Sequence, residues 1–399
     1  MKDDIFNIGR FGIDPKDAWT MPAPYFYDPN IYSVEMREIF RKTWRFVGHE
    51  SQVSRRGDFV TRDIGDESVI VLRGRDGVLR AFYNVCQHRA HRLLKERQGS
   101  IQSVIVCPYH AWTYESTGKL RGAKNAENVC GFDKQSFGLK SVALEIFCGF
   151  VFINLSSNPG PLAGQVPGFE ETLRRHIPDL DRMQFNGQQD FDIDANWKVV
   201  VENSLDAYHV YLSGPAHRAF GNLIDQADIE MTPKGGWMLL RSGPGDPDNQ
   251  AYNFRSNIGK GQTKDYVTLF LWPDLLLFTY PYVNGLWSFL VSPRSPERTH
   301  EEIAVYTPNG AILDESTRAA VDWIKNSLGP EDVQLNFGVQ AGLKSAGYHQ
   351  SRLLVQDALG WSSEHSIHYF QALVLESLGQ IEAGSASKLV DAYRVRNAG

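Results

Sequence analysis

The sequence holds two short segments that each pair a cysteine with a histidine, Cys86-Gln87-His88 and Cys107-Pro108-Tyr109-His110. In each segment the two side chains stand two or three positions apart, so one tight loop can direct both at the same metal cluster. Together the segments offer two thiolates and two imidazoles. They therefore predict a metal centre that draws half of its ligands from histidine.

Two kinds of centre use such a ligand set. In a Rieske 2Fe-2S cluster, histidines replace cysteines on one of the two irons. Zinc also takes two cysteines and two histidines, but zinc fingers order them as a cysteine pair followed by a histidine pair. Here each loop holds one of each, within a strand-rich region, which favours the iron–sulfur cluster. His91 competes with His88, and the Cys-x-His spacing favours His88.

The composition around these loops is that of a folded globular protein. Of 399 residues, 42% are hydrophobic and 12% aromatic, which excludes general disorder. The net charge of −6, from 41 basic and 47 acidic residues, argues against a nucleic-acid partner. No apolar run is long enough to span a membrane. Four cysteines are too few for a disulfide scaffold, so we expect a cytoplasmic protein. Cys130 and Cys148 lack histidine partners, and we expect them to be buried thiols.

The chain divides at a Pro-, Gly- and Ser-rich stretch, residues 156–168. We expect an N-terminal arm over 1–40 that packs on the catalytic domain, a mostly-β iron–sulfur domain over 41–160 and a catalytic domain over 161–399. The catalytic part combines strands over 267–306, including an Asn284-Gly285 hairpin turn, with helical patterns over 197–211, 314–328, 330–345 and 363–378. The predicted fold class is α+β, an antiparallel sheet covered by helices.

A second group of ligand-type side chains lies downstream, at Asn203, Asp206, His209 and His217. If 197–211 is one helix, then Asn203, Asp206 and His209 share a face. The Ser213-Gly214-Pro215 break can bring His217 to His209. Two histidines and one carboxylate form the facial triad of non-heme Fe(II) oxygenases. We choose Asp332 as the carboxylate, with Glu331 and Asp206 as competitors.

Both groups together resemble the catalytic α subunit of Rieske non-heme iron oxygenases, the aromatic-ring-hydroxylating family. The resemblance covers nearly the whole chain and rests on ordered matches: Tyr25-Phe-Tyr-Asp-Pro to His49, Cys86-Gln-His88-Arg89, Cys107-Pro-Tyr-His110-Ala-Trp112-Thr-Tyr114, Asn196-Trp197-Lys198 through His209, and Glu331-Asp332 with Gln340-Ala-Gly342-Leu. The chain departs from the family's usual pattern in two places. The gap between His88 and Cys107 is slightly long, and seven residues separate His209 from His217.

The resemblance implies a helix-grip catalytic domain, a mononuclear Fe(II) bound by His209, His217 and Asp332, and O₂ as co-substrate. It also implies a homotrimer, with or without a β subunit, in which each cluster serves the iron of its neighbour through Asp206 as the bridging carboxylate. Asn203 lies in the same matched segment and is a further candidate catalytic residue. Electrons would come from NAD(P)H through a separate reductase, directly or by way of a ferredoxin.

The substrate is a small molecule whose class the sequence leaves open. Our first interpretation is hydroxylation of an aromatic compound or aromatic acid, and the alternative is oxidation or N-demethylation of an N-methylated amine or betaine. Eight aromatic residues between Tyr266 and Phe289 could line a pocket for a ring or a methylated cation, or could simply fill a sheet core. A Rieske electron carrier and a zinc-stabilised binding protein are the other function classes considered.

Overall fold

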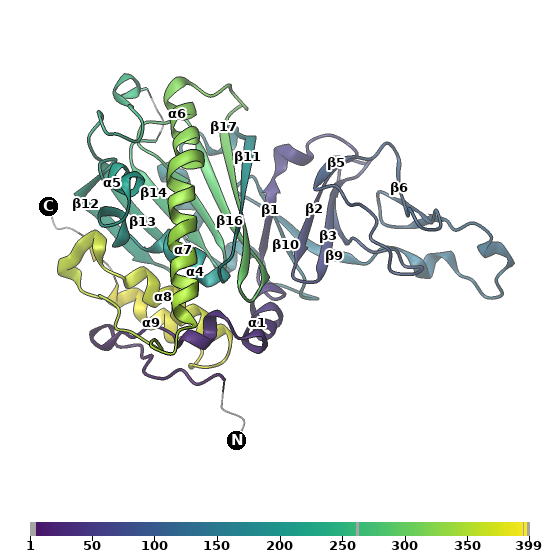
Figure 1. Ribbon diagram of the computed structural model, residues 1–399. Helices are drawn as coiled ribbons and strands as arrows, with labels where there is room; N and C mark the ends of the chain where they lie inside the picture. Colours follow the sequence, from purple (N-terminus) through teal and green to yellow (C-terminus); the bar gives the residue numbers. More distant parts are fainter. Residues whose placement is uncertain (1–4, 261–262, 394, 397–399) are drawn as a thin grey trace. The chain divides into compact units, whose positions relative to one another are not determined.

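The computed structural model describes residues 5–260, 263–393 and 395–396 (Figure 1). Contacts between Cα atoms divide the chain into two compact units. One unit contains residues 40–162, and the other contains 1–39 together with 163–399. The N-terminal segment therefore belongs to the same unit as the long C-terminal part.

The unit of residues 40–162 is built from antiparallel strands. Its seven-stranded sheet has the order β1-β10-β9-β4-β3-β2-β5, and a small sheet has the order β6-β7-β8. The strands are β1 (Arg45–His49), β2 (Asp58–Ile64), β3 (Glu67–Arg73), β4 (Leu79–Tyr83), β5 (Gln98–Ser100), β6 (Val104–Val106), β7 (Thr113–Glu115), β8 (Leu120–Gly122), β9 (Ser141–Phe147) and β10 (Phe150–Asn154). Asp76-Gly77 connects β3 to β4, and Thr117-Gly118 connects β7 to β8, as glycine-containing turns should.

An eight-stranded antiparallel sheet forms the centre of the larger unit, in the order β11-β17-β16-β15-β14-β13-β12-β18. Its strands are β11 (Met183–Ile193), β12 (Ile224–Pro233), β13 (Trp237–Pro244), β14 (Tyr266–Leu271), β15 (Leu275–Thr279), β16 (Leu286–Ser295), β17 (Arg298–Pro308) and β18 (Val395–Arg396). Apolar residues on the sheet are almost fully buried, which places the main core of this unit against it.

Helices cover one face of this sheet, and the long α7 runs across it in Figure 1. The helices are α1 (Pro29–Glu35), α3 (Phe169–His176), α4 (Trp197–Leu205), α5 (Pro215–Gly221), α6 (Glu315–Trp323), α7 (Gly329–Leu343), α8 (His365–Ser377) and α9 (Ser385–Ala392), and the short α2 (Leu162–Gln165) lies at the division between the units. Helix α4 packs against α7, α8 and the strands β16 and β17. The predicted α+β class, an antiparallel sheet covered by helices, is confirmed.

Two helix predictions were wrong in detail. The pattern over 197–211 was expected to be one helix, but α4 ends at Leu205, and Asp206 leaves the helical conformation with φ −85° and ψ 113°. The patterns over 314–328 and 330–345 were expected to be separate helices. They form one continuous helical run, because the π-helical turn Ile324–Leu328 joins α6 to α7. Such π-turns within helices often mark functional sites.

The N-terminal segment is anchored to α4 by a buried ion pair. The Glu35 carboxylate lies 2.6 Å from the Lys198 ammonium, and it accepts a 2.8 Å hydrogen bond from the Trp197 indole N–H. Both charged side chains are fully buried. A buried charge is tolerated only when it is paired, so this contact fixes α1 against the start of α4.

Candidate iron–sulfur and mononuclear iron sites

The two Cys/His loops adopt the same backbone turn. In each loop, the cysteine N–H donates to the carbonyl five residues further on, at 2.9 Å for Cys86 and 2.8 Å for Cys107. The amide four residues further on donates back to the cysteine carbonyl, at 3.0 Å in both loops. That amide belongs to Ala90 or Ala111, and both alanines have φ of 55°. The loops therefore share one geometry although their Cys-to-His spacings differ.

The four predicted cluster ligands divide between the interior and the surface. Cys86 and Cys107 are buried in a core cluster, whereas His88 and His110 are exposed. The two imidazole rings lie 4.7 Å apart, and the ring of His88 stacks on the Trp112 indole at 4.8 Å. Two buried thiols below two adjacent exposed imidazoles fit a cluster with its cysteine-bound iron inside and its histidine-bound iron at the surface. Electrons would leave such a cluster through the histidines.

Tyr114 contacts this site, although sequence reasoning gave it no role. Its hydroxyl lies 3.2 Å from the Cys86 sulfur and accepts the Gln87 N–H at 3.0 Å. Burial raises the pKa of the Cys86 thiol, and the Tyr114 hydroxyl opposes that shift by hydrogen bonding to the sulfur. Hydrogen bonds to cluster sulfurs are one way in which a protein sets the reduction potential.

His91 and the other two cysteines of this unit have different surroundings. A ring nitrogen of His91 contacts the Arg92 carbonyl, so His91 is engaged with the backbone while His88 stands beside His110. The expectation that Cys130 and Cys148 are buried was wrong, because Cys130 is exposed and Cys148 is half-buried. Both lie in turns, where the side chain of a short residue can face water.

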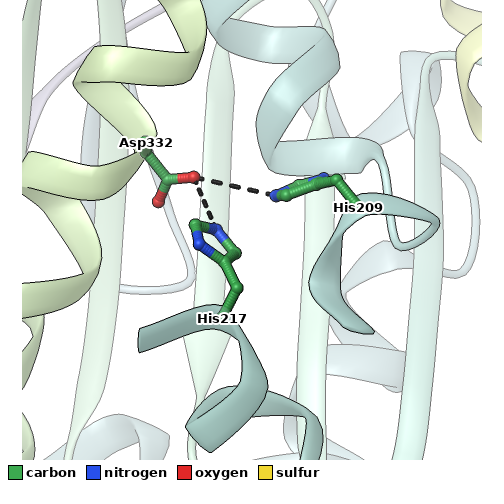
Figure 2. A group of neighbouring side chains, drawn as sticks. All are labelled: His209, His217 and Asp332. Carbon is green, nitrogen blue, oxygen red and sulfur yellow. Dashed lines mark hydrogen bonds and ion pairs between the residues drawn. The ribbon is translucent and has the colours of Figure 1, made fainter. Parts of the chain in front are cut away.

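Three side chains from distant parts of the chain meet in the larger unit, as Figure 2 shows. Asp332 Oδ1 lies 2.9 Å from His217 Nε2 and 3.7 Å from His209 Nε2. The ligand atoms of the three residues all lie within 4.8 Å of one another. These are the three residues chosen from the sequence. A metal ion between them would have two imidazoles and one carboxylate on one side and open positions on the other.

Asp206 contacts His209, but the two residues do not share a helix face as predicted. It follows the last residue of α4, and its carboxylate accepts the Tyr208 N–H at 2.7 Å and lies 2.9 Å from His209 Nδ1. His209 itself begins the short 3₁₀ turn His209–Tyr211. The end of α4, rather than its continuation, thus turns the second nitrogen of His209 toward Asp332.

Glu331 contacts the outer ring nitrogen of His217, as Asp206 contacts that of His209. Its carboxylate lies 2.6 Å from His217 Nδ1 and also accepts the His217 backbone N–H at 2.9 Å. By sequence alone Glu331 competes with Asp332 as a metal ligand, but the structure directs it to the nitrogen that faces away from the triad. A Cβ on Gly214 would lie 1.5 Å from this carboxylate, so a larger residue there would displace Glu331 from His217.

The charges around the triad shift the pKa values of its members. Burial alone would lower the pKa of His209, but hydrogen bonds with Asp206 and Asp332 outweigh it and raise the pKa to about 9. For His217, burial is likewise outweighed by Asp332 and Glu331, and its pKa is raised. Burial would raise the pKa of Asp332, yet the two histidines hold it below its usual value. In the metal-free site, the two histidines therefore hold protons that a bound cation can displace.

A cavity of about 50 Å³ opens beside the triad, and its wall is rich in aromatic rings. Of the eight aromatic residues between Tyr266 and Phe289, four line it: Tyr266, Phe278, Tyr280 and Phe289. Phe220 and Trp361 complete the aromatic wall, and sequence reasoning missed both because they lie outside the strand region. Among the described residues that line this cavity, none is a lysine or an arginine.

A second cavity, of about 270 Å³, lies on the other side of Asp206 and His209. Glu202 and Glu364 line it, and burial raises the pKa of both carboxyl groups. Asn203 lines both cavities, as do Asp206 and His209. The Asp206–His209 pair thus separates the aromatic cavity from a more acidic one.

Comparison with protein families gives two matches. Residues 43–141 match the Rieske 2Fe-2S domain, and residues 180–380 match the catalytic domain of the ring-hydroxylating α subunit. The first match contains all four predicted cluster ligands, and the second contains all three residues of the triad.

Relatives with described activities cover most of the chain. The carnitine monooxygenase oxygenase subunit of Escherichia coli K12 is 36% identical over 369 residues, which are 92% of this chain and 96% of that protein. The glycine betaine monooxygenase oxygenase subunit of Chromohalobacter salexigens is 35% identical over 53% of this chain and 46% of that protein. A solved quaternary ammonium Rieske monooxygenase superposes with a TM-score of 0.85 at 31% identity, over 93% of this chain and 99% of that one.

Proposed function

Because the chain belongs to the family of Rieske non-heme iron oxygenases, as an oxygenase subunit, we propose that it oxidises an N-methylated amine or betaine at its mononuclear iron. Membership brings a Rieske 2Fe-2S cluster, a mononuclear iron and O₂ as co-substrate. The proposal concerns the substrate and the residues that serve each centre. It replaces our first interpretation, an aromatic substrate, with the alternative that the relatives favour.

The composition of the aromatic cavity is the single observation that best supports a cationic substrate. Six aromatic residues line it, with Asp206 and Asp332 as its acidic groups. Ring faces attract a quaternary ammonium group, most strongly where water is excluded. A trimethylammonium group would therefore find both ring faces and acidic groups in this cavity.

In this proposal, Cys86, His88, Cys107 and His110 hold the cluster, and His209, His217 and Asp332 hold the mononuclear iron, which supplies O₂ activation. Asp206 fixes the ring of His209 and Glu331 fixes the ring of His217, since a carboxylate on the outer nitrogen sets tautomer and orientation. Asn203 stays a predicted catalytic residue, because it lines both cavities without a side-chain hydrogen bond among the described residues.

The reaction inserts one oxygen atom of O₂ into a C–H bond next to nitrogen. The other atom leaves as water, which takes up two electrons and two protons. We assign the electrons to NAD(P)H through a separate reductase. Asp206 would pass them to His209 from the cluster of a neighbouring chain in a trimer, a role that its position between the two cavities supports.

Reductase-coupled oxidation of a substrate panel tests the proposal. With an NAD(P)H-dependent reductase supplied, we expect O₂ uptake and loss of an N-methyl or trimethylamine group with carnitine, glycine betaine or a related cation. Benzoate and anthranilate should give no product. Hydroxylation of the aromatic acids, with no turnover of any cation, would contradict the proposal.

Within the residues that the structure describes, no helix has both the length and the apolar character needed to cross a membrane. The family assignment implies a small-molecule substrate and electron-transfer partners.

A further inference from the structure

The indole N–H of Trp361 is a buried hydrogen-bond donor without a partner in the described chain. The side chain is 4% exposed, and its indole N–H has no hydrogen-bond partner among the described residues. An indole nitrogen can only donate. Leaving such a group unpaired in the interior is costly, so an unpaired donor in a native structure calls for an explanation.

Trp361 is one of the residues that line the aromatic cavity beside the triad. It lies in the turn Asp357–Ser362, directly after Gly360, whose φ of 54° interrupts the helical path. That left-handed conformation favours glycine. The sharp bend therefore places Trp361 against Tyr266, with the two rings 6.0 Å apart and nearly perpendicular.

A second donor group belongs to the same part of the cavity wall. Tyr280 lines the cavity and packs on Tyr266 at 5.6 Å. Within the described part of the chain, its hydroxyl group makes no hydrogen bond. Burial raises its pKa, so this hydroxyl keeps its proton and can donate. Two neutral donors thus flank one ring, in a wall where no lysine or arginine of the described chain stands.

We propose that Trp361 is a specificity-determining residue whose indole N–H, assisted by the Tyr280 hydroxyl, binds the carboxylate oxygen of a zwitterionic betaine. This inference rests on the proposed function. An ammonium group has no lone pair to offer and cannot satisfy these donors, so they require an acceptor elsewhere on the substrate. Neutral donors can bind a carboxylate without adding a positive charge that would repel the quaternary nitrogen. The cavity therefore selects betaines over quaternary ammonium ions that carry no oxygen.

The test compares Trp361→Phe with the wild-type holoenzyme on matched substrates. Glycine betaine and carnitine carry the carboxylate, and isobutyltrimethylammonium replaces the carboxylate of glycine betaine with an isosteric apolar group. A hydrogen bond to a charged acceptor corresponds to roughly 10- to 100-fold in binding. We expect KM for the carboxylated substrate to rise by about that factor, while KM for isobutyltrimethylammonium changes less than about twofold and kcat changes little for either.

Trp323→Phe is the matched control, because Trp323 packs against Tyr280 and Phe220 but is not part of the cavity wall. It should change KM for both kinds of cation alike. Iron content and the Rieske spectrum verify that each variant is folded and loaded.

Two results would overturn the role of Trp361. One is an equal loss for both kinds of cation in Trp361→Phe, as expected if the N–H bonds only to water. The other is a wild-type enzyme that prefers isobutyltrimethylammonium. Failure of the proposed function is distinguishable, because the wild type would then oxidise none of these cations.

Discussion

Each histidine of the triad is held at both ring nitrogens. Nε2 of His209 and of His217 faces Asp332, while Nδ1 contacts Asp206 or Glu331. Two of these carboxylates lie next to each other on α7, so one helix both offers a ligand and orients another. A cation at the centre would find its imidazoles already aligned, which lowers the entropic cost of binding it.

Removing the charge of Asp206 should separate electron transfer from metal binding. In Asp206→Asn, the amide still contacts His209 but cannot stabilise positive charge on the ring. We expect both metal centres to stay loaded and turnover to fall by at least about 100-fold, the upper range for loss of an outer-shell partner. Iron analysis with stopped-flow reoxidation of the cluster measures both effects. Glu170→Gln, in the exposed Arg174–Glu170 pair, is a control that should behave as wild type. Normal turnover in a fully loaded Asp206→Asn variant would refute the role.

Iron binding to the metal-free site should depend on pH with a definite sign. Ligation needs neutral imidazole, and the pKa of His209 is raised to about 9. Iron must therefore displace protons at neutral pH, and affinity should rise with pH until about pH 9, by about tenfold per unit for each proton displaced. Anaerobic Fe(II) titration of chelator-treated protein at pH 6.5, 7.5 and 8.5 measures this. A constant affinity would mean that the histidines are already neutral.

Among the secondary-structure elements, α4 links the N-terminal segment to the iron site. Its first turn holds Lys198 against Glu35, and its last residue precedes Asp206. Burial lowers the pKa of Lys198, and Glu35 opposes that shift. The ion pair therefore secures the first turn of the helix whose other end leads into the site residues.

Breaking this pair should destabilise the protein. Glu35→Gln leaves Lys198 buried without its counter-ion, which costs about 3–5 kcal/mol. Thermal unfolding should show a clear loss. Glu35→Leu combined with Lys198→Met should recover part of it, because two apolar side chains need no pairing, although the Trp197 N–H loses its acceptor. The exposed pair removed by Glu170→Gln should cost less than about 1 kcal/mol. Equal stability of Glu35→Gln and wild type would show that the pair contributes nothing.

Local sequence signals predicted some of these elements and missed others. Gly77 marked the turn between β3 and β4, because its positive φ of 83° is a local requirement, whereas Asn284-Gly285 precedes β16 without a positive φ. The end of α4 could not be foreseen in this way. Apolar spacing continues through Tyr208, yet the contact between Asp206 and His209 favours an extended residue at the helix end. Tertiary contacts overrode a helical pattern that was locally reasonable.

At the scale of the whole molecule, the ordered motifs were the strongest guide. They predicted the α+β class and the family, both of which are confirmed, and they named the three residues that the fold brings together. The partners of those residues were harder to find. Glu331 lies beside Asp332 in sequence, and only its hydrogen bonds with His217 show which of the two turns away from the triad. Trp361 gave no signal, because an isolated tryptophan in a turn resembles any core residue.

The central claim is that this chain carries two independent iron centres, with His209, His217 and Asp332 holding the second. Iron and acid-labile sulfide content of His217→Ala, measured beside wild type, tests it most directly. We expect three irons and two sulfides per wild-type chain, and two irons and two sulfides in the variant with an unchanged Rieske spectrum. A variant that retains the third iron, or that loses the cluster along with it, would contradict the assignment.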